Sequence, residues 1–138
     1  MPTLVTGATG FLGSHLVQEL VRQGDEVRAL VRPQTNPREL AGLPVEIARG
    51  DLTQPDTIAA AMRGVDRVFH TAAKVEIGAS VDSGMSQLNT EGTRTVLEAA
   101  WREGVERVVY TSSVGAIGAC DVHHRLNEDD IYRGLGTS

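Results

Sequence analysis

Three glycines stand at three-residue spacing near the start of the chain, in the stretch VTGATGFLG: Gly7, Gly10 and Gly13. A β-rich run, Thr3–Thr6, precedes them, and an amphipathic helical pattern, Phe11–Gln23, follows them. In a turn of this kind Gly7 permits a tight reversal, Gly10 lets a phosphate approach backbone N–H groups, and Gly13 allows close helix–strand packing. The helix N-terminus adds N–H donors and the positive end of a dipole. The stretch therefore predicts a cradle for a phosphate-bearing ligand, with a purely structural turn as the alternative.

Hydroxyl groups beside the glycines are further candidate donors to a phosphate. They belong to Thr6, Thr9 and Ser14. No Lys-Ser or Lys-Thr pair follows the glycines, so the chain does not carry the mononucleotide P-loop.

Elements that could position this cradle alternate along the chain, each β-rich run being followed by a helical pattern or a short turn. The predicted strands are Thr3–Thr6, Glu26–Val31, Val45–Arg49, Arg67–Thr71 and Arg107–Ser112, and the predicted helices are Phe11–Gln23, Pro55–Met62, Gln87–Glu103 and a short piece at Asn36–Leu40. Thr53 is a candidate cap for the helix that begins at Pro55. The last two strands are apolar at nearly every position, which suits strands covered on both faces. Strand–helix–strand repetition predicts an α/β fold, a doubly wound parallel sheet in the order 3-2-1-4-5, within one domain over residues 1–138.

Composition excludes several other classes of protein. A net charge of −5 and a pI near 5.3 disfavour nucleic-acid binding. No apolar run approaches the roughly 18 residues of a membrane span, and the N-terminus lacks a signal-peptide pattern. The single cysteine, Cys120, cannot form an internal disulfide, and no Cys/His cluster has metal-binding spacing, so no metal site is expected. These features together favour a cytoplasmic protein.

The segment GATGFLG, opening directly from the first strand, resembles the extended short-chain dehydrogenase/reductase family. That family includes NAD(P)-dependent sugar epimerases and dehydratases and the dihydroflavonol-reductase-like enzymes. Four further segments resemble it in the same order: VRALVRP, GDLTQ, HTAA and NTEGTRTVLEAAWREGVERVVYTSSVGAIG. VRALVRP and VVYTSS favour the dihydroflavonol-reductase-like branch. The resemblance, which runs from residue 3 to about 118, implies a Rossmann-type fold and hydride transfer between a nicotinamide and a carbonyl or alcohol substrate.

The resemblance also implies which residues contact the cofactor. They lie in the glycine stretch and at the ends of later strands: Gly7, Thr9, Gly10, Phe11, Leu12, Gly13, Asp51, Leu52, Thr71, Ala72, Ala73 and Ser112. Asp51 would accept a hydrogen bond from the adenine amino group; its alternative role is that of a turn or helix-capping residue. His70, just before Thr71, is interpreted as a buried strand residue.

The end of the second strand distinguishes NADP from NAD. An acidic residue there binds the free ribose 2′-hydroxyl of NAD, whereas an arginine accommodates the 2′-phosphate of NADP. The strand ends in Arg32, with no acidic residue, so NADP is the preferred cofactor and NAD the other candidate. Arg28 is a weaker candidate helper, and a solvated charge at a strand end is the alternative for Arg32.

Two residues are implied for the catalytic half of the site. Ser113, with Ser112 as a stand-in, would hydrogen-bond the substrate oxygen; the alternative is a hydroxyl that caps the strand end. Asn89 would position the active site from the long helix, and because a mid-helix asparagine is locally unfavourable, we expect it to have a partner. Lys74 is a weaker candidate near the nicotinamide.

The family's Tyr-x-x-x-Lys pair is missing from the sequence, in which Lys74 is the only lysine. Family members carry this pair after a loop like residues 114–138. We therefore expect the N-terminal portion of a longer enzyme, incomplete at the C-terminus, without its substrate lobe and inactive as it stands. A small-molecule substrate is implied, and reductase, epimerase and dehydratase activities stay open. A homodimer through the long helix, with Trp101 as a core or interface residue, is also open. The alternative functions are a non-catalytic NADP-binding sensor or scaffold, and a partner domain with a vestigial glycine turn.

Overall fold

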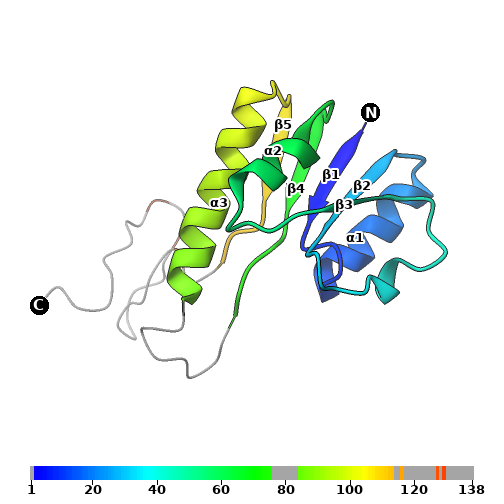
Figure 1. Ribbon diagram of the computed structural model, residues 1–138, viewed down its shortest axis with the longest axis horizontal. Helices are drawn as coiled ribbons and strands as arrows, with labels where there is room; N and C mark the ends of the chain where they lie inside the picture. The colour runs from blue at the N-terminus through cyan, green and yellow to red at the C-terminus, as the bar shows by residue number, and fades with distance from the viewer. Residues whose placement is uncertain (1, 76–83, 114–115, 117–126, 128, 130–138) are drawn as a thin grey trace, which may run out of the picture.

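The computed structural model describes residues 2–75, 84–113, 116, 127 and 129 (Figure 1). In chain order the elements are β1 (Thr3–Thr6), α1 (Phe11–Arg22), β2 (Val27–Val31), η1 (Arg38–Leu40), β3 (Glu46–Arg49), α2 (Pro55–Met62), β4 (Arg67–His70), α3 (Met85–Arg102) and β5 (Arg107–Tyr110). Cys120 and almost all of the predicted loop over residues 114–138 lie outside the described residues. None of the helices described here combines the length and the apolar character that crossing a membrane requires.

The strands form one parallel sheet in the order β3-β2-β1-β4-β5, which confirms the predicted order 3-2-1-4-5. Thr3 of β1 pairs with Val27 of β2 on one side and with Arg67 of β4 on the other. The chain therefore winds outward from β1 in one direction and then returns to continue in the other. The order reverses between β1 and β4, and in a doubly wound sheet of this Rossmann type the crevice for a ligand opens at that point, at the carboxyl ends of the strands.

Helices cover both faces of the sheet: α1 lies on one face, and α2 and α3 lie on the other (Figure 1). Leu4 and Val5 of β1 are both fully buried because successive side chains of a strand point to opposite faces. Leu4 packs in the cluster with Ile58 of α2 and Val96 of α3, whereas Val5 packs in the cluster with Val17 of α1. This two-sided burial explains why β1 is apolar along its centre.

The outer strand β5 differs from the prediction. It was expected to be covered on both faces, yet Val109 is 43% exposed and Tyr110 is 50% exposed. The physical reason is its position: β5 is an edge strand, so within the described residues Val109, on the face away from α3, packs in neither core cluster. Tyr110 lies on the α3 side with Val108, and its ring is covered in part, by stacking on His70. The neighbouring β4 agrees with the prediction better, because Val68 and His70 are fully buried.

Element boundaries shift by one or two residues from those predicted, and the end of β4 shows why. The predicted strand runs to Thr71, but β4 ends at His70. Beyond that residue the Thr71 hydroxyl donates to the Thr6 carbonyl at 2.7 Å, and the Ala72 N–H donates to Thr6 Oγ1 at 3.3 Å. Side-chain hydrogen bonds thus replace the backbone ladder. Likewise β5 ends at Tyr110 rather than Ser112, and α3 begins at Met85.

Candidate functional site

A cavity of about 570 Å³ opens at the carboxyl ends of the strands. Its lining comes from the glycine loop, from the chain just after β2, β3 and β4, and from the first turns of α3. The lining residues are Gly7, Thr9, Gly10, Leu30, Arg32, Gly50, Asp51, Leu52, Thr53, Thr71, Ala72, Ala73, Lys74, Val75 and Leu88. The fold therefore brings most of the predicted cofactor-binding residues, spread over more than sixty positions of the chain, to one cavity.

The three glycines of the loop differ in what a side chain at each position would meet. Gly7 has φ +69°, and a Cβ there would lie 2.8 Å from the Ala72 nitrogen. A Cβ on Gly13 would lie 2.1 Å from the Gly7 carbonyl oxygen, so α1 can pack this closely only on a glycine. At Gly10 the backbone is extended (φ −81°, ψ 173°), and a Cβ would meet only Gly7 O, at 3.2 Å. Packing thus requires Gly7 and Gly13, whereas Gly10 borders open space in the cavity.

The N-terminus of α1 offers donors beside that open space. Gly10 is the N-cap residue and has no side chain that could cap the helix, and the first turn holds no acidic residue. The first hydrogen bond of the helix runs from Ser14 N to Gly10 O, at 2.9 Å. The N–H groups of Phe11, Leu12 and Gly13 come before it and therefore have no acceptor within the helix. The side chains of Phe11 and Leu12 are 86% and 52% exposed, and neither these residues nor Gly13 belong to the cavity lining, so their contact with a cofactor stays a prediction. The arrangement suits an anion.

Two of the three hydroxyls predicted as phosphate donors serve the fold instead. Thr6 Oγ1 lies 2.6 Å from His70 Nδ1 and also accepts from the Ala72 N–H. Ser14 Oγ donates to the Phe11 carbonyl at 3.2 Å within α1. The prediction was wrong for these two residues because their partners lie in the protein itself. Thr9 alone of the three lines the cavity.

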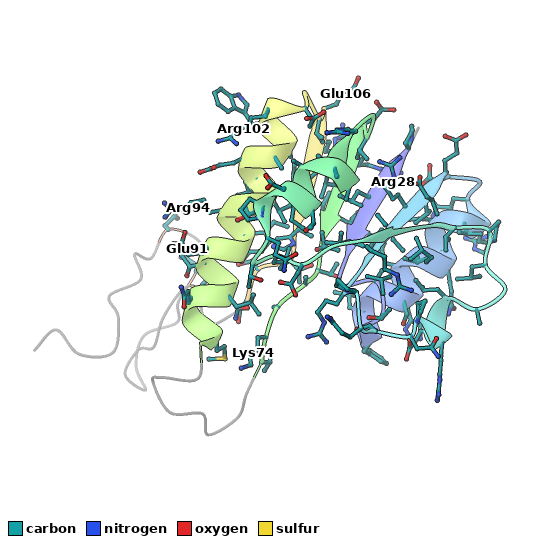
Figure 2. The ribbon with its side chains drawn as sticks, viewed as in Figure 1. Arg28, Lys74, Glu91, Arg94, Arg102 and Glu106 are labelled. Carbon is teal, nitrogen blue, oxygen red and sulfur yellow. The ribbon has the colours of Figure 1, made fainter. Side chains whose placement is uncertain are left out.

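Arg32 is exposed and lines the cavity, whereas Arg28 is bound elsewhere. The Arg28 guanidinium donates to the Glu46 carboxylate at 2.8 Å and to the carbonyls of Ala61 and Arg63 at 2.8 and 2.7 Å. Figure 2 shows Arg28 and Lys74 toward opposite ends of the sheet. Arg28 is therefore excluded as a helper of Arg32: its position near the start of β2 places it at the wrong edge.

Asp51 is engaged in a local turn. Its Oδ1 accepts hydrogen bonds from the Thr53 hydroxyl at 2.7 Å and from the Thr53 N–H at 2.9 Å. These two bonds, together with the nearby charge of Arg32, lower the pKa of Asp51, so the carboxylate is ionised at neutral pH. Thr53 is consequently not the cap of α2; the N-cap is Gln54, without a side-chain bond. The turn role of Asp51 is present, and its contact with adenine stays a prediction.

Asn89 has the partner that a mid-helix asparagine was expected to need. Its Oδ1 accepts from the Lys74 N–H at 2.8 Å, and its Nδ2 donates to the Lys74 carbonyl at 2.9 Å. Both ends of the amide thus hold one residue of the chain after β4, which forms part of the cavity wall. Asn89 therefore fixes the backbone of Lys74 in the cavity wall, and its role in positioning an active site stays a prediction.

His70 is fully buried and joins three elements. Its Nδ1 contacts Thr6 of β1, its Nε2 lies 3.0 Å from Thr93 Oγ1 of α3, and its ring stacks on Tyr110 of β5 with centroids 5.3 Å apart. Burial lowers the pKa of His70, which keeps the imidazole neutral. The interpretation as a buried strand residue is confirmed.

Ser112 and Ser113 follow β5 and are exposed. Neither belongs to the cavity lining, so the described structure does not bring them together with the glycine loop. Their roles toward substrate and cofactor stay predictions. Sequence reasoning missed Leu88 and Gly50, which do line the cavity. A Cβ on Gly50 would lie 2.9 Å from Leu30 Cδ1, a crowding that no local pattern reveals.

Comparison with known proteins gives consistent results. The model of the 3-beta hydroxysteroid dehydrogenase/isomerase family matches residues 4–133. The chain is 48% identical over 118 residues to sterol demethylase protein B of Methylococcus capsulatus and 42% identical over 124 residues to a putative dihydroflavonol 4-reductase of Synechocystis. These alignments cover 86% and 90% of this chain but 36% of each relative.

Among solved structures, the UDP-glucose 4-epimerase of Thermus thermophilus, in complex with NAD, superposes with a TM-score of 0.82 at 35% identity. That superposition covers 96% of this chain and 44% of the epimerase. The chain thus spans 36% to 44% of the length of these three proteins.

Proposed function

Because the chain belongs to the 3-beta hydroxysteroid dehydrogenase/isomerase family, we propose that residues 1–138 form the nicotinamide dinucleotide-binding domain of an oxidoreductase or epimerase. The observation that supports this most strongly is Gly10. A Cβ there would meet only the Gly7 carbonyl, which would have to yield by a few tenths of an ångström, and the side chain would enter the space between the cavity and the free N–H groups of α1. A pyrophosphate needs that space and those donors.

The chain's own residues have distinct parts in this proposal. The N–H groups of Phe11 and Leu12 would bind the pyrophosphate, and Asp51 with Leu52 would border the adenine. Asn89, through Lys74, would hold the wall formed by residues 71–75 against the nicotinamide. A bound nicotinamide accepts or supplies a hydride. Ser113 would hydrogen-bond the carbonyl or alcohol oxygen of a small-molecule substrate.

NADP is the cofactor that the charges of the cavity favour. Arg32 borders the cavity at the end of β2, and no acidic residue occupies that strand end. A guanidinium binds a phosphate through paired charge-assisted hydrogen bonds, which a free ribose hydroxyl cannot match. The Thermus epimerase was solved with NAD, so NAD is the competing candidate.

Replacing Arg32 tests both the binding of a dinucleotide in the cavity and the preference for NADP over NAD. We expect the unaltered chain to bind NADP more tightly than NAD, and Arg32→Ala to weaken NADP binding by about tenfold or more while changing NAD binding less than about twofold. Isothermal titration with each dinucleotide measures this. Arg38→Ala, an exposed arginine of η1 outside the cavity, is the matched loss of charge and should change neither affinity. Equal affinities that Arg32→Ala leaves unaltered would contradict the preference.

A non-catalytic NADP-binding sensor or scaffold is the second candidate; the absence of Tyr-x-x-x-Lys from the 138 residues favours it only if no residues follow Ser138 in the protein. Without that pair we expect this chain to bind NADPH without oxidising it when carbonyl substrates are added. The absorbance of NADPH, followed after the substrate is added, measures this, and a steady fall in that absorbance would contradict the expectation.

The low cysteine content and the acidic pI support a cytoplasmic location for either function.

A homodimer through α3 is part of the proposal. Leu97 and Trp101, one helical turn apart, are 42% and 83% exposed, and the ion pair between Arg102 and Glu98 lies beside them. Such an apolar pair on a helix suits contact with a second copy. Sedimentation equilibrium should show a dimer that Trp101→Glu weakens at least about tenfold and Trp101→Phe does not. A chain that stays monomeric at every concentration would contradict it.

A further inference from the structure

Arg49, the last residue of β3, binds the turn that carries Arg32. Its Nη1 donates to the Arg32 carbonyl at 3.1 Å and to the Thr35 carbonyl at 2.7 Å. The same turn is closed by a hydrogen bond from Thr35 N to Arg32 O at 3.0 Å. One guanidinium nitrogen thus holds both ends of a four-residue turn from the neighbouring strand.

The turn leads directly out of β2, and its geometry decides where the Arg32 side chain begins. Pro33 occupies its second position, where a fixed φ favours a β-turn. Val31, the last residue of β2, is in register with Arg49 of β3, so the guanidinium starts from a strand whose position is set by the sheet. Arg32 lines the cavity, whereas Arg49 does not. Any influence of Arg49 on a ligand of the cavity therefore passes through the turn.

We infer that Arg49 is a positioning residue for cofactor preference: by holding the turn from Arg32 to Thr35, it pre-orders the guanidinium that binds the 2′-phosphate. This inference rests on the proposed preference for NADP. A side chain whose backbone is already held loses less freedom when it binds, so its hydrogen bonds contribute more to affinity. NAD makes no such contact and should not depend on Arg49.

The test compares Arg49→Met with Arg49→Lys by isothermal titration of the whole 138-residue chain with NADP and NAD. We expect Arg49→Met to lower the ratio of NADP to NAD affinity by about fivefold, with NAD affinity changed less than about twofold. Arg49→Lys should restore most of the ratio, because an ammonium can still donate to both carbonyls. Arg49 and Arg63 both line a second, smaller groove. Arg63→Met removes an equal charge from that groove, away from the turn, and should leave the affinity ratio unchanged.

A double variant separates an effect through Arg32 from a general effect of charge. In the Arg32→Ala background, Arg49→Met should leave the ratio unchanged, because the group that it positions is gone. The same fivefold loss in that background, or in Arg63→Met, would overturn the inference. A wild-type preference for NADP that Arg49→Met leaves intact would overturn the inference alone. A wild-type chain with no preference would overturn the proposed cofactor preference and this inference with it.

Discussion

Gly13→Ala is expected to cost the fold about 3 kcal/mol or more, the largest stability effect that we expect from one added methyl group. The methyl would stand 2.1 Å from the Gly7 carbonyl oxygen and 3.0 Å from the Ala8 Cα, both backbone atoms that cannot turn aside as a side chain could. Helix α1 would have to move away from the glycine loop, and its Val17 and Leu20 would lose packing against strand residues such as Val5. Urea denaturation followed by circular dichroism measures the loss.

Gly24→Ala is the matched control for this prediction. Gly24 also lies beside α1 and has φ +85°, but a Cβ there meets no atom within 4 Å. Its substitution therefore adds backbone strain without a clash, worth about 1–2 kcal/mol. A smaller loss for Gly13→Ala than for Gly24→Ala would contradict the close packing of α1 on the loop.

Gly10→Val is expected to abolish dinucleotide binding, weakening it by at least about a hundredfold, while the chain stays folded. The backbone at Gly10 suits any residue, and only the Gly7 carbonyl, 3.2 Å from the new Cβ, has to yield by a few tenths of an ångström. The valine methyls would instead occupy the space that the pyrophosphate needs beside the N–H groups of α1. Titration with NADP and with NAD measures the loss of binding, and circular dichroism measures whether the chain stays folded.

The control for this second prediction is Gln54→Val. Gln54 is the N-cap of α2, makes no side-chain capping bond and lies outside the cavity lining, so valine there places the same side chain at an equivalent helix start. We expect unchanged binding. If Gly10→Val also kept its affinity, the glycine loop would be only a structural turn, and the proposed function would lose its main support.

Predictions from the sequence succeeded where the signal is local. The spacing of apolar residues, the glycines after Thr6 and the alternation of strands with helices depend on residues near one another in the chain. From these the order β3-β2-β1-β4-β5 follows, because right-handed crossovers leave few other arrangements. Most of the predicted cofactor residues reach one cavity for the same reason: parallel strands end at a common edge.

Only the tertiary structure decided which polar groups remain free to bind a ligand. Thr6 and Thr9 look alike in the sequence, yet Thr6 is bound to His70, far along the chain, and Thr9 borders the cavity. Arg28 and Arg49 are both strand arginines; the register of β2 with β3 sends one to the Glu46 carboxylate and the other to the turn that carries Arg32. A side chain's partner depends on which strands become neighbours and in what register. That information is absent from any short stretch, VTGATGFLG included, and appears only when the sheet is assembled.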